Sequence, residues 1–185
     1  MFTRVNDMAK MHKVYVLLSG GVDSTTTLAI ARDEFPSAIF EAVTVDYGQR
    51  HKKEAEFAGA QAAFYGAEHY TLDMQGILTG MLVDKGTENE AIPDVGYADL
   101  APGISPTYVS FRNGFMLSLI AARAQAWVME MEQRREAARK NPTYDGELED
   151  GFEATIYCGV HADDGVNWAY PDCTPEFIGP MSAVI

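Results

Sequence analysis

The feature that most constrains the fold of this chain is a glycine-containing turn between a predicted strand and a predicted helix. The apolar, β-branched run Val14–Leu18 predicts a buried strand, and Ser24–Glu34 predicts a helix. The turn between them reads Ser19-Gly20-Gly21-Val22-Asp23. Glycines there let backbone N–H groups approach an anion at the positive end of the helix dipole. The sequence therefore predicts a phosphate-binding loop, with an ordinary turn as the plain alternative.

The side chains around this turn fit an anion and its counterion. Hydroxyl groups are hydrogen-bond donors, and the Asp23 carboxylate could hold Mg²⁺ or cap the helix. The turn lacks the Gly-Lys-Ser/Thr of one common phosphate loop and the G-x-G-x-x-G spacing of dinucleotide-binding proteins. The residues expected to contact phosphate are Ser19, Gly20, Gly21, Asp23, Ser24 and Thr25.

The rest of the chain alternates predicted strands with predicted helices. Further strands are expected at Ala38–Asp46, Glu68–Leu72 and Ala154–Val160, and further helices at Lys52–Tyr65 and Arg112–Lys140. This alternation predicts an α/β fold with a parallel sheet and a ligand beyond the carboxyl ends of its strands. The Gly- and Pro-containing stretch 79–111 is too long for a simple connection, so a functional loop or lid is expected.

Composition narrows the class of partner. With 185 residues, 47% of them hydrophobic, the chain is long enough for a single domain with its own core. A net charge of −13 disfavours nucleic acid and membrane surfaces as partners. The two cysteines exclude a disulfide-rich secreted scaffold, and no apolar run has the length of a membrane span. We therefore expect a cytoplasmic protein.

Four motifs, in this order, resemble one family. They are Ser19-Gly-Gly-Val-Asp-Ser24, the segment Val43–His51, the segment Ser105–Asn113 and Tyr170-Pro-Asp-Cys-Thr-Pro-Glu-Phe177. Together they resemble the 7-cyano-7-deazaguanine synthases, which belong to the N-type ATP pyrophosphatases, and the resemblance extends from about Val14 to Ile178. It implies a Rossmann-like parallel sheet of the ATP pyrophosphatase type.

The resemblance also implies a reaction. The family converts 7-carboxy-7-deazaguanine, ammonia and ATP into the nitrile 7-cyano-7-deazaguanine, releasing AMP and pyrophosphate. ATP and Mg²⁺ would bind at the glycine turn, with Val45 and Asp46 beside the adenosine. Arg50 and His51 would face a further anionic group, since the helix dipole disfavours cations at a helix N-terminus; the alternative is a cationic first turn on a solvated face.

Two further segments would hold the substrate. Arg112 is expected to bind a phosphate or the substrate carboxylate through its planar fork, and Asn113 to contact the ligand or cap the helix. Asp164, Tyr170 and Asp172 are expected to recognise the guanine-like base by hydrogen bonds and stacking. His161-Ala-Asp with Pro-Asp-Cys173 weakly resembles a zinc deaminase, but the required glutamate and second cysteine are missing.

Three departures from the family pattern leave alternatives open. Ser110-Phe111 stands where the family usually has Pro-Gly, and a charged stretch covers 130–153. The family's C-terminal four-cysteine zinc cluster has no counterpart, so we expect no zinc. Either another subunit covers the apolar helix predicted after Pro175, or the protein is a shortened version with weakened catalysis. Of these two, a homo-oligomer is expected. The alternatives are an enzyme that stops at the amide and a nucleotide-binding module without catalysis.

Overall fold

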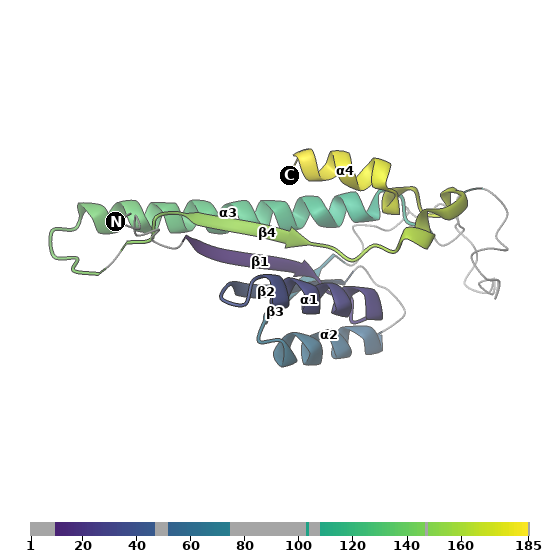
Figure 1. The fold of residues 1–185 in the computed structure, drawn as a ribbon, viewed down its shortest axis with the longest axis horizontal. Helices are drawn as coiled ribbons and strands as arrows, with labels where there is room; N and C mark the ends of the chain where they lie inside the picture. Colours follow the sequence, from purple (N-terminus) through teal and green to yellow (C-terminus); the bar gives the residue numbers. More distant parts are fainter. Residues whose placement is uncertain (1–9, 47–51, 75–102, 104–107, 147, 185) are drawn as a thin grey trace, which may run out of the picture.

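Four parallel strands form the centre of the molecule, in the order β3-β2-β1-β4 (Figure 1). The computed structural model describes residues 10–46, 52–74, 103, 108–146 and 148–184. The strands are β1 (Met11–Leu17), β2 (Ile39–Asp46), β3 (Glu68–Asp73) and β4 (Phe152–Tyr157). The predicted α/β fold with a parallel sheet is confirmed.

Helices cover both faces of the sheet. The helices α1 (Val22–Glu34) and α2 (Lys52–Phe64) lie on one face, and α3 (Arg112–Lys140) lies on the other (Figure 1). Short 3₁₀ helices η2 (Ala162–Trp168) and η3 (Pro171–Cys173) follow β4 and lead into α4 (Pro175–Val184). Alternating strand residues supply two cores, because successive side chains of a strand point to opposite faces.

The two cores differ in polarity. On the α1 and α2 side, Val14, Val16 and Leu18 pack with small and apolar helix residues such as Leu28. On the α3 side, the core around Tyr15 includes the carboxylate of Glu41, which is only 1% exposed. Glu41 forms an ion pair with Lys13 at 2.7 Å and a second one with Arg123. Burial would raise the pKa of Glu41, but hydrogen bonds from Arg123 and Lys13 lower it, so the carboxylate stays charged.

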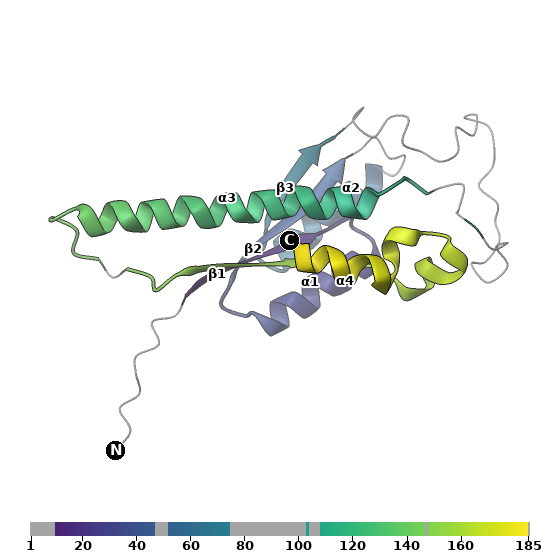
Figure 2. The same cartoon turned by 90° about the horizontal axis from the view of Figure 1, so that it is seen from above.

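The long helix α3 extends the molecule beyond the sheet. Its 29 residues run alongside β4, and its C-terminal half continues past the start of β1 (Figure 2). The predicted charged stretch 130–153 is the end of α3, the following loop and the start of β4. Most of it is exposed, but Arg135 stacks on Phe152 and binds the carbonyl of Asp150 at 2.7 Å. This arginine therefore joins the helix to the returning strand.

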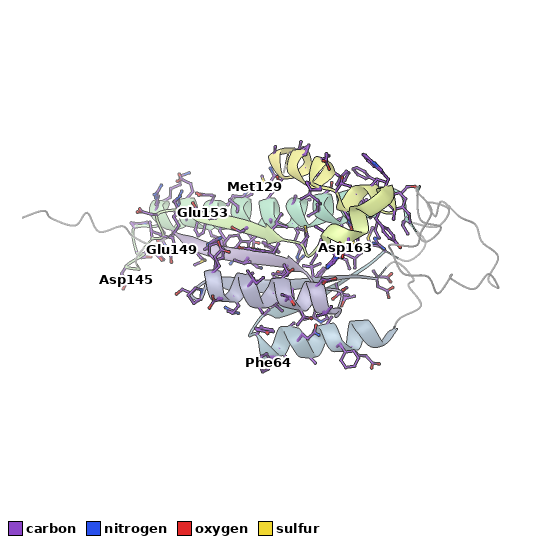
Figure 3. The ribbon with its side chains drawn as sticks, turned by 45° about the vertical axis from the view of Figure 1, so that its right-hand side comes forward. Phe64, Met129, Asp145, Glu149, Glu153 and Asp163 are labelled. Carbon is purple, nitrogen blue, oxygen red and sulfur yellow. The ribbon has the colours of Figure 1, made fainter. Side chains whose placement is uncertain are left out.

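Apolar residues remain exposed on the outer surfaces. Phe64 on α2 and Met129 on α3 lie on opposite sides of the molecule and are 82% and 55% exposed (Figure 3). The described part of α4 has no buried residue, and Phe177 makes an edge-to-face contact with Phe111. The expected cover from a second copy remains a prediction. Among the helices that the structure describes, none is long and apolar enough to cross a membrane.

Candidate active site

The predicted phosphate loop connects β1 to α1 in a conformation that depends on glycine. Gly20 has a φ of +92°, a region that L-residues with a Cβ rarely adopt, and Gly21 occupies the N-cap position of α1. No side chain caps the helix, so Asp23 does not play the capping role considered for it. Its exposed carboxylate lies in the first turn of α1, where the N–H groups have no partner within the helix.

A network of hydroxyl groups fixes this loop. The Ser19 amide donates to Ser24 Oγ at 3.2 Å, and the two serine Oγ atoms lie 3.1 Å apart. The Gly21 amide donates to Ser19 Oγ at 3.2 Å. Hydroxyls of Ser24 and Thr25 donate to the Gly21 carbonyl at 3.1 and 2.8 Å. The serines and Thr25 therefore define the loop's shape before any ligand contacts it.

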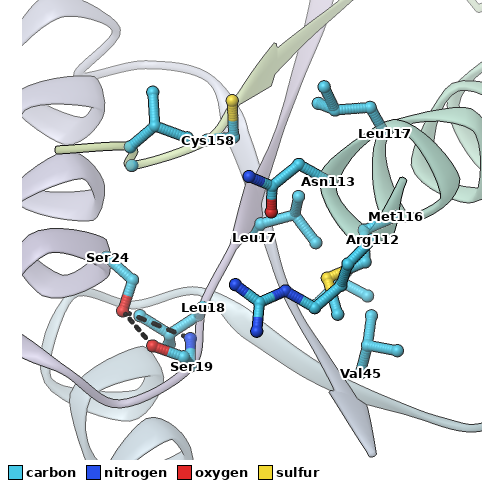
Figure 4. Close-up of a pocket in the computed structure, with 13 residues that line it drawn as sticks. Leu17, Leu18, Ser19, Ser24, Val45, Arg112, Asn113, Met116, Leu117 and Cys158 are labelled. Carbon is cyan, nitrogen blue, oxygen red and sulfur yellow. Dashed lines mark hydrogen bonds between the residues drawn. The ribbon is translucent and has the colours of Figure 1, made fainter. Parts of the chain in front are cut away.

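A pocket of about 280 Å³ opens beside this loop, between β1, β2, the end of β4 and the start of α3. Its volume is close to the lower end of the roughly 300–1,000 Å³ typical of small-molecule sites. Polar groups from two elements face each other across it, while its floor is apolar (Figure 4). Of the predicted site residues, those that line the pocket are Ser19, Ser24, Val45, Arg112 and Asn113.

Arg112 brings a cation to the side opposite the loop. It is the first residue of α3, and its guanidinium points across the pocket toward Ser19 and Ser24 (Figure 4). The preceding residue, Phe111, has a φ of +58°, which is unusual for an aromatic residue. Its amide donates to the hydroxyl of the buried Tyr108 at 3.0 Å. This bend directs the start of α3, and with it Arg112, into the pocket.

Asn113 is not the N-cap, because α3 begins at Arg112 and its N-cap is Phe111. The N-terminal support comes instead from Asp172, whose Oδ2 accepts the Asn113 amide at 2.8 Å. The Asn113 side chain donates to the Asp172 carbonyl at 3.2 Å and to Cys173 Sγ at 3.2 Å. Asp172 is only 2% exposed, and its expected contact with the substrate base remains a prediction.

A second carboxylate, that of Asp164, interacts electrostatically with Asp23 on the loop side of the site and with Arg112 on the opposite side. Burial raises the pKa of Asp164, the charge of Asp23 raises it further, and His161 and Arg112 lower it. The main chain of Asp164 accepts the Tyr170 amide at 3.0 Å, and the Tyr170 ring meets Tyr108 edge to face. The structure thus brings Asp23, Asp164 and Arg112 toward one end of the sheet.

Neither cysteine is a reactive thiolate in this arrangement. Burial raises the pKa of the Cys158 thiol, and burial with the nearby charge of Asp172 raises that of Cys173 to about 11. In the described part of the chain, no three histidine, cysteine or acidic side chains gather as a metal site. The expectation of no zinc remains a prediction.

Other predicted residues lie around the pocket without lining it. Asp46 ends β2 beside Asp73 of β3, with its carbonyl accepting the Met74 amide. Arg50 and His51 lie outside the described residues, as does most of the expected loop or lid at 79–111.

The sequence reasoning missed several residues that line the pocket. Met116 and Leu117 follow Arg112 and Asn113 by four residues, so the helical period could have indicated them. Cys158, Gly159 and Val160 come directly after β4, at the carboxyl edge where ligands were expected. Gly159 has no room for a side chain, since an added Cβ would lie 2.6 Å from Thr27 Oγ1.

Comparison with known proteins gives a family match and close relatives. The profile of the family described as "Queuosine biosynthesis protein QueC" matches residues 13–133. The 7-cyano-7-deazaguanine synthase of Stenotrophomonas maltophilia is 34% identical over 175 residues, which are 94% of this chain and 64% of the relative. That of Nitrosospira multiformis is 36% identical over 171 residues, covering 91% of this chain and 59% of the relative. The chain thus spans about three fifths of the length of these relatives.

Solved structures give a weaker likeness. The NH3-dependent NAD synthetase of Campylobacter jejuni is 22% identical, with a TM-score of 0.32 over 47% of this chain and 36% of that one. The U34-tRNA thiolase NcsA of Methanococcus maripaludis is 12% identical, with a TM-score of 0.41 over 96% of this chain and 65% of that one.

Proposed function

Because the chain belongs to the QueC family of queuosine biosynthesis proteins, we propose that it uses ATP and ammonia to convert the carboxylate of 7-carboxy-7-deazaguanine into a nitrile. The observation that carries this proposal is the pocket itself. Hydroxyl groups of the β1–α1 loop and the guanidinium of Arg112 face each other across one cavity. Two anions that must react, a triphosphate and a carboxylate, need such opposed groups to overcome their mutual repulsion.

The triphosphate would lie on the loop. Ser19, Ser24 and Thr25 would hold the loop in shape around the phosphates. Gly20 and Gly21 would allow close approach, and the free N–H groups of the first turn of α1 would face the phosphates. Val45 and Asp46, at the end of β2, would border the adenosine. Arg50 and His51 would add positive charge beside the phosphates.

Magnesium fits the donor set of this site. Mg²⁺ in nucleotide sites is commonly held by one or two carboxylates together with phosphate oxygens, and Asp23 offers an exposed carboxylate at the loop. When bound, the ion would neutralise charge on the departing pyrophosphate. Asp164, whose charge interacts with that of Asp23, is near enough to influence the same region.

The proposed chemistry consists of two activations. A carboxylate oxygen of the substrate attacks the α-phosphorus. The bond from that phosphorus to the α,β-bridging oxygen breaks, and pyrophosphate leaves with its electron pair. Ammonia then attacks the acyl carbon, AMP leaves, and an amide forms after loss of a proton. The amide oxygen then attacks the α-phosphorus of a second ATP in the same way, and loss of AMP and of both nitrogen protons gives the nitrile. Arg112 would hold the carboxylate or α-phosphate bidentately throughout.

Recognition of the base would come from the segment after β4. We propose that Asp164 accepts hydrogen bonds from the N–H edge of the deazaguanine and that the ring of Tyr170 packs against it. Asp172 would act through α3, since one of its oxygens already binds the amide of Asn113. Asn113 would contact the substrate from the edge of the pocket that it lines.

The test is a product analysis. The purified chain is incubated with 7-carboxy-7-deazaguanine, ammonium, ATP and Mg²⁺, and products are identified by mass and by nucleotide chromatography. We expect AMP, pyrophosphate and the nitrile. Amide as the final product would support the shorter reaction, ADP with free phosphate would contradict the loop assignment, and no ATP binding would indicate a module without catalysis.

Matched variants then connect the reaction to the pocket. Asp23→Ala and Arg112→Ala should each remove most pyrophosphate release. Arg134→Ala is the control, because Arg134 is 68% exposed on the same helix and, among the described residues, its ion pair is the local one with Glu130. A loss in the control equal to that in Arg112→Ala would contradict the proposed role of Arg112.

A second copy of the chain is the proposed partner of α4. The helix is rich in apolar residues, and none of its described residues is buried. Light scattering after size-exclusion chromatography, over a range of protein concentrations, should detect a dimer or larger assembly. A monomer at every concentration would contradict this part of the proposal.

A further inference from the structure

A chain of hydrogen bonds reaches the phosphate loop from behind, through the side chains of Thr44 and His69, which do not line the pocket. It begins at the carbonyl of Leu18, the residue directly before the loop. The hydroxyl of Thr44 on β2 donates to this carbonyl at 2.6 Å. Thr44 is 1% exposed, so this bond has no competing water.

The imidazole of His69 completes the chain. Its Nε2 lies 2.8 Å from Thr44 Oγ1. A hydroxyl group has one proton, and that of Thr44 is used on the Leu18 carbonyl. Thr44 therefore accepts from His69, which places a proton on Nε2. Burial lowers the pKa of His69 and so favours the neutral ring, and the hydrogen bond to Thr44 then selects the Nε2 tautomer.

The bond to Leu18 also determines the direction of the Ser19 amide. The peptide between Leu18 and Ser19 is planar and trans, so a fixed carbonyl fixes the N–H on its other side. That N–H donates to Ser24 Oγ at 3.2 Å, and both serines line the pocket. The orientation of the loop's hydroxyl groups is thus connected to Thr44 through a single rigid peptide.

A separate contact holds the carbonyl of Gly20. Gln61 on α2 donates through Nε2 to the carbonyl of Gly20 at 3.2 Å. Since Gly21 O is bound by Ser24 and Thr25, the carbonyls of Leu18, Gly20 and Gly21 are all bound by side chains. The amides of Ser19 and Gly21 are also used within the loop, so the N–H groups that remain to meet an anion are those of the first turn of α1.

We infer that Thr44 and His69 are positioning residues of the nucleotide loop: they hold the Leu18–Ser19 peptide so that the hydrogen-bonded pair Ser19 and Ser24 keeps the loop in the shape that receives the triphosphate. This inference rests on the proposed function of the pocket. Neither residue touches the nucleotide, so their effect on catalysis passes through the loop. Replacing either residue should therefore change the KM for ATP and leave the KM for the other substrates unchanged.

The test compares three side chains at one position. Thr44→Val has nearly the same shape but lacks the hydroxyl, so we expect KM for ATP to rise about tenfold, the order expected for a lost hydrogen bond with its partners left buried. KM for ammonium should stay unchanged. Thr44→Ser keeps the hydroxyl and should restore KM to within about twofold of wild type.

His69→Ala tests whether the two residues act as one chain. Thr44 keeps its bond to Leu18 in this variant, so the rise in KM for ATP should be smaller. Thr44→Val with His69→Ala should be no worse than Thr44→Val alone, because both changes interrupt the same connection. Additive losses would contradict the chain and indicate two independent effects.

The matched control is a second threonine–histidine pair in the same sheet. Thr155 Oγ1 on β4 lies 2.8 Å from His12 Nε2, with no contact to the loop. Thr155→Val should lower thermal stability without changing KM for ATP. Equal rises in KM for Thr155→Val and Thr44→Val would overturn the inference, as would an unchanged KM in Thr44→Val.

Binding and exchange measurements separate this inference from the proposed reaction. One outcome is that the wild type binds the uncleavable analogue α,β-methylene-ATP and yet forms no product from ATP. In that case the proposed reaction is wrong, and the dissociation constants of the analogue for the same variants decide the inference. If the wild type does not bind it, amide hydrogen exchange of the loop decides: faster exchange in Thr44→Val than in Thr155→Val supports the positioning role. Equal exchange would overturn it.

Discussion

Replacing Asp172 with alanine should destabilise the start of α3. Its Oδ2 accepts the amide of Asn113 at 2.8 Å, and Phe111 provides no side-chain cap. A hydrogen bond to a charged acceptor contributes about 1.5–3 kcal/mol. The negative charge near the helix N-terminus adds about 0.3–1 kcal/mol. These terms set the upper limit of the loss.

One term acts in the opposite direction. Asp172 Oδ1 is buried without a hydrogen-bond partner among the described residues, and such an atom costs about 1–3 kcal/mol. Its removal offsets part of the loss, so we expect a net loss of about 1–2 kcal/mol in the free energy of unfolding. For a chain of this size, about 2–4 °C per kcal/mol gives a decrease in Tm of roughly 2–8 °C.

Urea unfolding followed by circular dichroism measures this loss as a shift in midpoint at constant slope. Asp163→Ala is the matched control, because the Asp163 side chain is 69% exposed on the neighbouring η2. It should change stability by less than about 0.5 kcal/mol. An Asp172→Ala variant as stable as this control would refute the argument that Asp172 supports the helix.

Three further predictions concern the loop and the charges around it. Gly20→Ala should lose about 1–2 kcal/mol of unfolding free energy, because Gly20 has a φ of +92°. Gly21 has a φ of −77°, so Gly21→Ala should lose less. Equal losses in urea unfolding would contradict backbone strain at position 20. Arg112→Lys should recover only part of the ten- to hundredfold loss in kcat/KM expected for Arg112→Ala at roughly 1.5–3 kcal/mol, and full recovery would show that only charge matters. Asp164→Asn should raise Tm at pH 7, because burial raises the folded pKa of Asp164 and its ionised form is destabilising above that pKa. This gain should disappear below about pH 4, where both states are protonated, and a pH-independent gain would rule out ionisation as its cause.

Local patterns predicted most of the fold. The spacing of apolar residues after Arg112 predicted a helix over Arg112–Lys140, and α3 has the same bounds in the structure. The first strand begins at Met11 rather than at Val14, where the apolar run predicted its start, and it includes the buried Lys13. Its charge is compensated by Glu41, a partner 28 residues away that a local pattern does not reveal.

The site was predictable where its residues are neighbours in sequence. The loop from Ser19 to Thr25 needs only a strand, two glycines and a helix, all of which are visible in the sequence. Contacts across the fold were not predictable in this way. Asn113 is 59 residues from Asp172, and the single histidine at 69 shows no pattern that indicates its bond to Thr44.

The conformation of Phe111 also constrains which sequences this site can accept over evolutionary time. A Cβ added at Gly114 would lie 2.5 Å from the Phe111 ring, which also contacts Phe177. A side chain at 114 and the present ring position are therefore mutually exclusive. A lineage that acquires phenylalanine at 111 must first have glycine at 114, or must give up the contact with Phe177. The two positions are thus epistatic, and the order in which they change is restricted.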